Sequence, residues 1–241
     1  MKKFLGLLLI LTAMAGAKTL TASYEVSFGV FQKMGMADTR LEIRDDQTYT
    51  IHVEARTTGI AKVLSNNRFE LYESRGTVKN GKLIPDTYMK IRQTNSKKNT
   101  KFYTFDHQNK IVWKETTEVA DGETHKEKDQ NDYYAKEDIL SLFFNLKYYS
   151  KGRQNTYFNA IGGNKTDGRI DVVFPQKEQL AAVKKELDRE EGEFLKVILN
   201  DRIFSSANGE LLINLDNEGL CEKAVLEDVL LFGDIVGKRV R

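Results

Sequence analysis

Alternation of apolar and polar side chains is the feature of this sequence that most limits its fold. Over residues 23–30 every second side chain is apolar or aromatic, and the same period of two returns over residues 39–44 and 48–55. A period of two puts successive side chains on opposite faces of a strand, so it predicts strands with one buried face. The first half of the chain is therefore expected to consist of strands.

Turn signals separate these strands at short intervals. Asn80-Gly81 is the strongest of them, because a type I′ hairpin turn needs two positive φ angles, which Asn and Gly tolerate best. Asp121-Gly122 and Asn208-Gly209 mark further turns. Strands follow one another without regular crossover helices, which argues against a doubly wound α/β fold. We predict a mainly β fold, an antiparallel β-barrel or roll of about a dozen strands.

Residues 58–65 break the period of two in a short helical or irregular stretch, and two longer segments also depart from it. Residues 135–149 are apolar over most of the circumference of a helix, which predicts a helix buried on several sides. We expect this buried helix to plug or cap the open end of the barrel. Residues 176–190 carry one thin apolar stripe and follow Pro175, so they predict a surface helix.

The N-terminus has the pattern of an export signal. Two lysines precede an apolar run over residues 4–14, and residues 15–17 read Ala-Gly-Ala, a pattern at which signal peptides are cut. The run is shorter than the roughly 20 apolar residues that a membrane-spanning helix needs. We predict a signal peptide over residues 1–17, cut after Ala17, and a periplasmic mature chain that does not span the membrane.

Composition limits the classes of partner. The chain has 37 Lys plus Arg and 35 Asp plus Glu, and removal of Lys2 and Lys3 leaves 35 of each. Such a balanced charge argues against nucleic acid as a partner, since nucleic-acid binders carry a basic excess. Cys221 is the single cysteine, so no internal disulfide is expected. With only two prolines and no linker, residues 18–241 are predicted to form one β-rich domain.

Residues suited to catalysis or metal binding are few. His52 is predicted on the polar face of a strand, His107 in a turn and His125 in a charged loop, and no two stand at metal-ligand spacing. Cys221 lacks a nearby base and is expected to be buried. Residues 162–166 are similar to a phosphate loop, but Asn164 stands where the Walker pattern needs Gly. We predict no metal, no cofactor and no catalytic residue.

Four segments are similar to a known family. They are E-D-I-L-S-L-F-F-N-L at 137–146, K-L-I-P-D-T-Y at 82–88, F-D at 105–106 and G-E-L-L-I-N-L-D-N-E-G-L at 209–220. In these segments the chain resembles the bacterial DUF3108 family of exported proteins of unknown function. The resemblance covers most of the mature chain and implies a β-rich envelope domain, similar in fold to barrels that carry lipoproteins or lipids. It implies no active site.

Aromatic residues on the buried helix carry the functional prediction. If the barrel holds a cavity, Phe143, Phe144 and Tyr148 would line or gate it and would contact an apolar ligand. Core packing is the alternative role of these rings. We predict a binder or carrier of a hydrophobic ligand, such as a lipid or acyl chain, in the cell envelope. Two alternatives remain: an envelope scaffold that binds a protein partner, and a hydrolase whose residues converge from distant strands.

Overall fold

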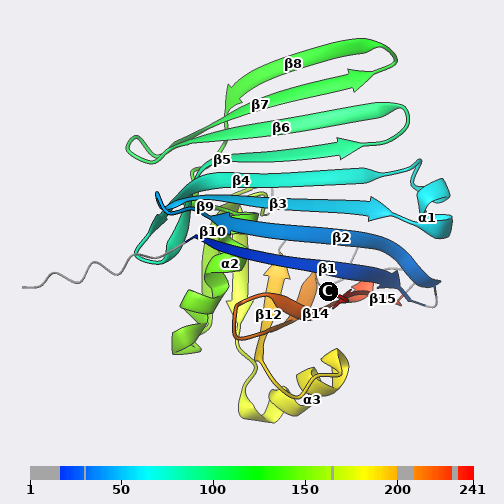
Figure 1. Ribbon diagram of the computed structural model, residues 1–241, viewed down its shortest axis with the longest axis vertical. Helices are drawn as coiled ribbons and strands as arrows, with labels where there is room; N and C mark the ends of the chain where they lie inside the picture. The colour runs from blue at the N-terminus through cyan, green and yellow to red at the C-terminus, as the bar shows by residue number, and fades with distance from the viewer. Residues whose placement is uncertain (1–16, 30, 164–165, 200–208, 230–232) are drawn as a thin grey trace, which may run out of the picture.

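Antiparallel strands make up most of the computed structural model, which describes residues 17–29, 31–163, 166–199, 209–229 and 233–241 (Figure 1). These residues form one sheet of fifteen strands. The strands are β1 Lys18–Phe28, β2 Phe31–Ile43, β3 Thr48–Thr57, β4 Phe69–Lys79, β5 Lys82–Gln93, β6 Lys97–Asp106, β7 Ile111–Ala120, β8 Glu123–Gln130, β9 Glu137–Asp138, β10 Thr156–Ile161, β11 Arg169–Val173, β12 Glu193–Leu199, β13 Glu210–Leu215, β14 Cys221–Val229 and β15 Gly233–Arg239.

Most neighbouring strands in the sheet are also neighbours in the chain. The spatial order runs from β8 down to β1, crosses to β15, and then runs down to β9. Each pairing is antiparallel except that of β9 with β10. The prediction of a mainly β, antiparallel roll is confirmed, with more strands than expected. The sheet is not closed, because its edge strands β8 and β9 do not pair with each other.

In the described residues, three α-helices accompany the sheet: α1 Gly59–Leu64, α2 Ile139–Tyr149 and α3 Lys177–Leu187, with a short 3₁₀ turn at Ser150–Gly152 after α2. Both predicted helices are present. The buried helix starts four residues later than expected because Glu137 and Asp138 pair with β10 as strand β9. Its N-cap, Asp138, then starts α2 with a capping box to Ser141.

Helix α2 is buried on several sides, as its sequence predicts. Leu142 and Leu146 pack with the strands of the second half of the sheet, Phe144 packs with β1–β3, and Leu140 reaches the cluster around Tyr88 on β5. In Figure 1, α2 lies beneath the left-hand ends of the long strands, which continue to the right beyond it. The helix therefore fills one end of the roll, and no other helix of the described residues lies beside it on this face.

Helix α3 packs on the opposite face of the sheet. Val183 and Leu187 form its apolar stripe and contact buried side chains of β12, β13 and β14. This arrangement confirms a surface helix with one thin apolar face.

Two further observations concern the predictions on export and on the membrane. None of the helices in the described residues is long and apolar enough to cross a membrane. Residues 1–16, which contain most of the predicted signal peptide, and residues 164–165 of the glycine-rich segment lie outside the described residues.

Candidate functional site

The face of the sheet that α2 contacts changes character along strands β4–β7. The part of this face beneath the start of α2 is apolar. There Tyr88, Phe105 and Val112 are buried and pack with Ile139 and Leu140 of the helix. Every second residue of a strand lies on the same face, so this face continues at positions two or four residues beyond the buried ones. They are Tyr72 on β4, Lys90 on β5, Tyr103 and Lys101 on β6, and Lys114 on β7.

A cavity of about 590 Å³ lies where α2 no longer covers this face. We call it the tyrosine–lysine cavity. Its cations are Lys90, Arg92, Lys97, Lys101 and Lys114; its tyrosines are Tyr88, Tyr103 and Tyr133; and Asn99, Glu118, Asn131, Asp132, Gly162 and Gly163 complete the wall. The volume is within the range of small-molecule sites, and the wall combines aromatic rings with positive charge.

Three of the cations in this cavity are matched by carboxylates. Lys97 lies 2.7 Å from Glu118, and Lys114 lies 3.0 Å from Asp129 on the neighbouring strand. Arg92 Nε lies 2.9 Å from Glu70 Oε1. Glu70 is shared, because it also accepts from Arg68 and from the Tyr72 hydroxyl.

Lys90 and Lys101 are not matched in this way. They face each other across the β5–β6 pair, and neither forms an ion pair with a carboxylate in the part of the chain that the structure describes. The ammonium group of Lys90 lies 5.0 Å from the centre of the Tyr72 ring. Burial lowers the pKa of Lys90, while the Glu70 carboxylate opposes that shift. Like charges directly opposite on a sheet face are destabilising, so this pair has a cost to the fold.

The tyrosines form the inner wall of the cavity. The rings of Tyr88 and Tyr103 stack with their centres 5.7 Å apart. Tyr88 is fully buried, and its hydroxyl has no hydrogen-bond partner among the described residues. That hydroxyl lies close to the backbone of Gly162, where an added Cβ would approach it to 3.1 Å. A buried hydroxyl without a partner is rare in folded proteins and indicates a place for a water or a ligand atom.

Two buried carboxylates lie deeper, at the start of α2. Asp138 accepts hydrogen bonds from the backbone N–H groups of Leu140 and Ser141 at 2.8 and 3.0 Å. Its other oxygen accepts from Ser74 Oγ on β4 at 2.6 Å, and Ser74 is 3.0 Å from the Tyr49 hydroxyl. Burial raises the pKa of Asp138 to about 6. Its partners are donors of the helix and the sheet, so this carboxylate joins the two.

Glu137 takes part in a second junction with the sheet. Its Oε1 accepts from Asn145 Nδ2 at 2.5 Å and from the Tyr149 hydroxyl at 3.0 Å. Asn145 also accepts from the Leu83 N–H and donates to the Leu83 carbonyl, both at 2.9 Å. Its side-chain amide thus pairs with β5 as a neighbouring strand would. Burial raises the pKa of Glu137. Neither acid lines the tyrosine–lysine cavity, so we interpret both as structural.

The aromatic residues predicted to bind a ligand lie elsewhere. Phe144 is buried in the core, and Phe143 contacts it edge to face with ring centres 5.5 Å apart. Tyr148 is half-buried beside Gly81, with Lys147 and Lys151 near its ring. None of the three lines the tyrosine–lysine cavity. Sequence reasoning missed that cavity because its tyrosines and lysines come from separate strands.

The three histidines are not brought together. His107 bonds the Pro85 carbonyl at 2.7 Å and the Tyr134 hydroxyl at 2.9 Å. His125 lies on β8, not in a loop as predicted. His52 Nε2 lies 3.1 Å from Glu54 Oε1 in a cavity that Ser23 and Asp38 also line. Ser23 Oγ donates its hydrogen bond to Asp38 and not to the imidazole. No group of three metal-binding side chains occurs among the described residues.

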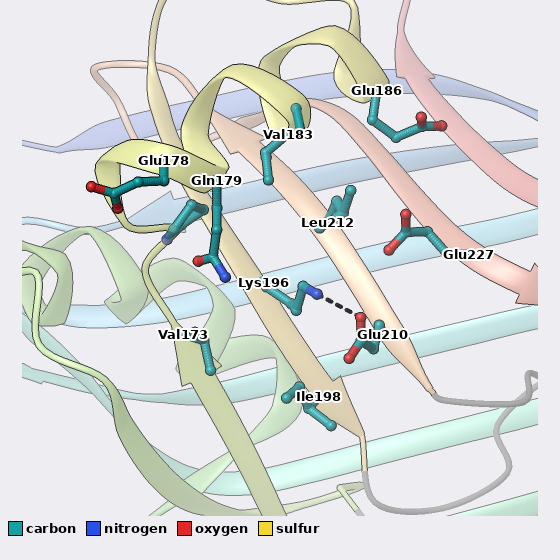
Figure 2. Close-up of a pocket in the computed structure, with 12 residues that line it drawn as sticks. Val173, Glu178, Gln179, Val183, Glu186, Lys196, Ile198, Glu210, Leu212 and Glu227 are labelled. Atoms are coloured by element: carbon teal, nitrogen blue, oxygen red, sulfur yellow. Dashed lines mark hydrogen bonds and ion pairs between the residues drawn. The ribbon is translucent and has the colours of Figure 1, made fainter.

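A second cavity, of about 620 Å³, opens on the outer face of the sheet beneath α3 (Figure 2). Val183 of the helix and Leu212 and Ile198 of the strands form its apolar part. An ion pair of 2.5 Å between Lys196 and Glu210 crosses its floor. Its remaining charged groups are acidic: Glu178, Glu186 and Glu227. Burial raises the pKa of Glu227, and the nearby Glu210 and Glu186 add to that effect.

The fold and this site define a class: an antiparallel β-roll, plugged at one end by a helix, with a ligand-sized cavity on its inner face. The family described as "Protein of unknown function (DUF3108)" matches residues 23–199. The chain therefore belongs to the DUF3108 family, as its sequence segments predict. Among solved structures the chain is similar to a beta-barrel-like protein of the domain of unknown function DUF1849 from Brucella abortus. That similarity has a TM-score of 0.49 at 9% identity and covers 95% of this chain and 98% of that chain. No curated protein matches the chain.

Proposed function

We propose that this chain is a non-enzymatic protein of the cell envelope that binds or carries a ligand with a hydrophobic part, such as a lipid or acyl chain. The observation that carries the proposal is the tyrosine–lysine cavity, whose wall includes Tyr88, Tyr103 and Tyr133. Aromatic rings offer large apolar contact areas, and concave sites of this size commonly bind small molecules. The N-terminal sequence pattern supports the envelope as the place of action.

The interior around α2 offers less room for such a ligand. Leu142, Phe144 and Leu146 are buried among side chains of both halves of the sheet. A ligand would therefore lie on the uncovered part of the inner face, beside the helix and not around it. In this proposal the apolar contacts come from Tyr88 of β5, Tyr103 of β6 and Tyr133 of the segment before α2.

Native mass spectrometry of the gently purified mature chain tests this proposal, followed by extraction and analysis of any bound lipid. We expect a bound mass in the native chain and a loss of most of it after Tyr103→Ala. Tyr157→Ala is the matched control, because Tyr157 is 57% exposed on β10 and does not line the cavity. A chain that retains no added acyl-chain probe, or a Tyr103→Ala variant that retains as much as the control, would contradict the proposal.

A further inference from the structure

The tyrosine–lysine cavity carries more positive charge than the carboxylates around it neutralise. Around it, six cations stand against four carboxylates. The cations are Arg68, Lys90, Arg92, Lys97, Lys101 and Lys114, and the carboxylates are Glu70, Glu118, Asp129 and Asp132. Most of the carboxylates are committed to ion pairs, and Asp132 lies exposed at the rim. An excess of two positive charges remains.

That excess is concentrated at one place. Lys90 and Lys101 are direct neighbours across β5 and β6, so their Cβ atoms are about 5 Å apart. Both side chains are half-buried, which reduces the screening of their repulsion by water. Glu70, the carboxylate that acts most on Lys90, is already bonded to Arg68, Arg92 and Tyr72. A bound anion would remove this repulsion.

We propose that Lys90 and Lys101 bind a phosphate group that carries two negative charges, with the polar groups of the neighbouring wall as further contacts. The inference rests on the proposed function and specifies the polar end of its ligand. A phosphate monoester has a charge of about −1.5 to −2 at neutral pH, which matches two ammonium groups, whereas a carboxylate matches one. Lysine ammonium groups bind phosphate well as point charges. The phosphate can belong to a lipid head group or be free in solution.

Two probes distinguish these sources in the mature chain. Calorimetry measures the binding of inorganic phosphate, and sedimentation measures binding to phosphatidylcholine vesicles with and without phosphatidic acid. We expect Lys90→Gln and Lys101→Gln each to weaken phosphate-dependent binding about tenfold, as for the loss of one charged contact. Lys98→Gln is the control, since Lys98 lies exposed on the other face of the same strand. Binding of inorganic phosphate alone indicates a free anion, and binding of acidic vesicles alone indicates a lipid head group.

A stability readout separates a ligand site from a structural one. Without ligand, Lys90→Gln and Lys101→Gln should melt at the same or a higher temperature than the native chain, because each substitution removes a like-charge contact. Phosphate should then raise the melting temperature of the native chain more than that of either variant. Equal binding of both phosphate probes by the two variants and by Lys98→Gln would overturn the inference. If a neutral acyl probe still binds in that case, the proposed function stands without the phosphate site.

Discussion

Asp138 shows how one side chain can determine the position of an element. Its carboxylate accepts from two backbone N–H groups at the start of α2 and from Ser74 on β4. Its own N–H donates to Ser141 Oγ at 3.0 Å, which completes the capping box. A helix cap contributes about 1 kcal/mol, and here the same group also bonds to the sheet. Both the start and the placement of α2 therefore depend on this residue.

Asp138 should make stability depend on pH. Burial raises its pKa from 3.8 to about 6, so between these values the folded chain holds a proton that the unfolded chain has released. The resulting stabilisation is complete below about pH 4 and is lost as the pH rises through 6, a change of about 3 kcal/mol. Asp138→Asn keeps a good N-cap and should not show this loss. Urea unfolding at pH 4, 5, 6 and 7 measures it; parallel curves for the two chains would refute the assignment.

At the scale of the element, α2 packs in the apolar clusters of both halves of the sheet. Phe144 is 6% exposed and packs with residues of β1, β2 and β3. We expect Phe144→Ala to lower the free energy of unfolding by about 3–5 kcal/mol, because it leaves a large cavity in the core. Phe143→Ala should cost less, since that ring is only partly buried. Chemical denaturation provides the measurement.

Leu64 of α1 provides a control for the substitutions on α2. Leu64 is 80% exposed, so Leu64→Ala should change stability by less than about 0.5 kcal/mol.

Ligand retention by Phe144→Ala should match that of the native chain under conditions where both are folded. A stable Phe144→Ala chain that has lost its ligand would instead give this ring a role in lining or gating the site, the alternative to core packing that the sequence leaves open.

Sequence reasoning worked best where periodicity and turn chemistry were local. The Asn80-Gly81 hairpin joins β4 to β5 with φ angles of +53° and +77°, as a type I′ turn requires. Both main helices were recognised from their apolar faces. Strand β8 was missed because its side chains are almost all exposed, so it lacks an apolar period. An edge strand with two solvated faces gives no such signal.

The candidate site could not be predicted for a different reason. A bulge in the β4–β5 pairing leaves Asp86 without an opposite residue on β4, so the buried residues change from Leu83 and Pro85 to Tyr88. A one-residue shift exchanges the two faces of a strand, and alternation counted from Leu83 would therefore turn Lys90 outward. The meeting of Lys90 with Lys101 depends on that shift and on the register of β6. Neither is visible in the sequence alone.

At the scale of the whole molecule, export remains a proposal with a direct test. We expect the chain, expressed with residues 1–17, to be recovered from the periplasmic fraction beginning at Lys18. Mass spectrometry of the intact protein and N-terminal sequencing measure the cleavage site. Replacing the apolar run over residues 4–14 with polar residues should keep the full-length chain in the cytoplasm, as for other signal peptides. Recovery of uncleaved chain in the membrane fraction would contradict cleavage after Ala17.

The pairing of β1 with β15 has a consequence for the order of folding. Tyr24 pairs with Arg239, and the backbone of Ser23 bonds that of Val240 and Arg241, so this junction joins residues from opposite ends of the chain. Contacts between such distant residues form slowly, because a long loop must close before they are made. The two halves of the sheet can each grow by local hairpins, but they can join only after β15 has been synthesised. In an exported protein, this junction would close only after nearly all of the chain had reached its destination.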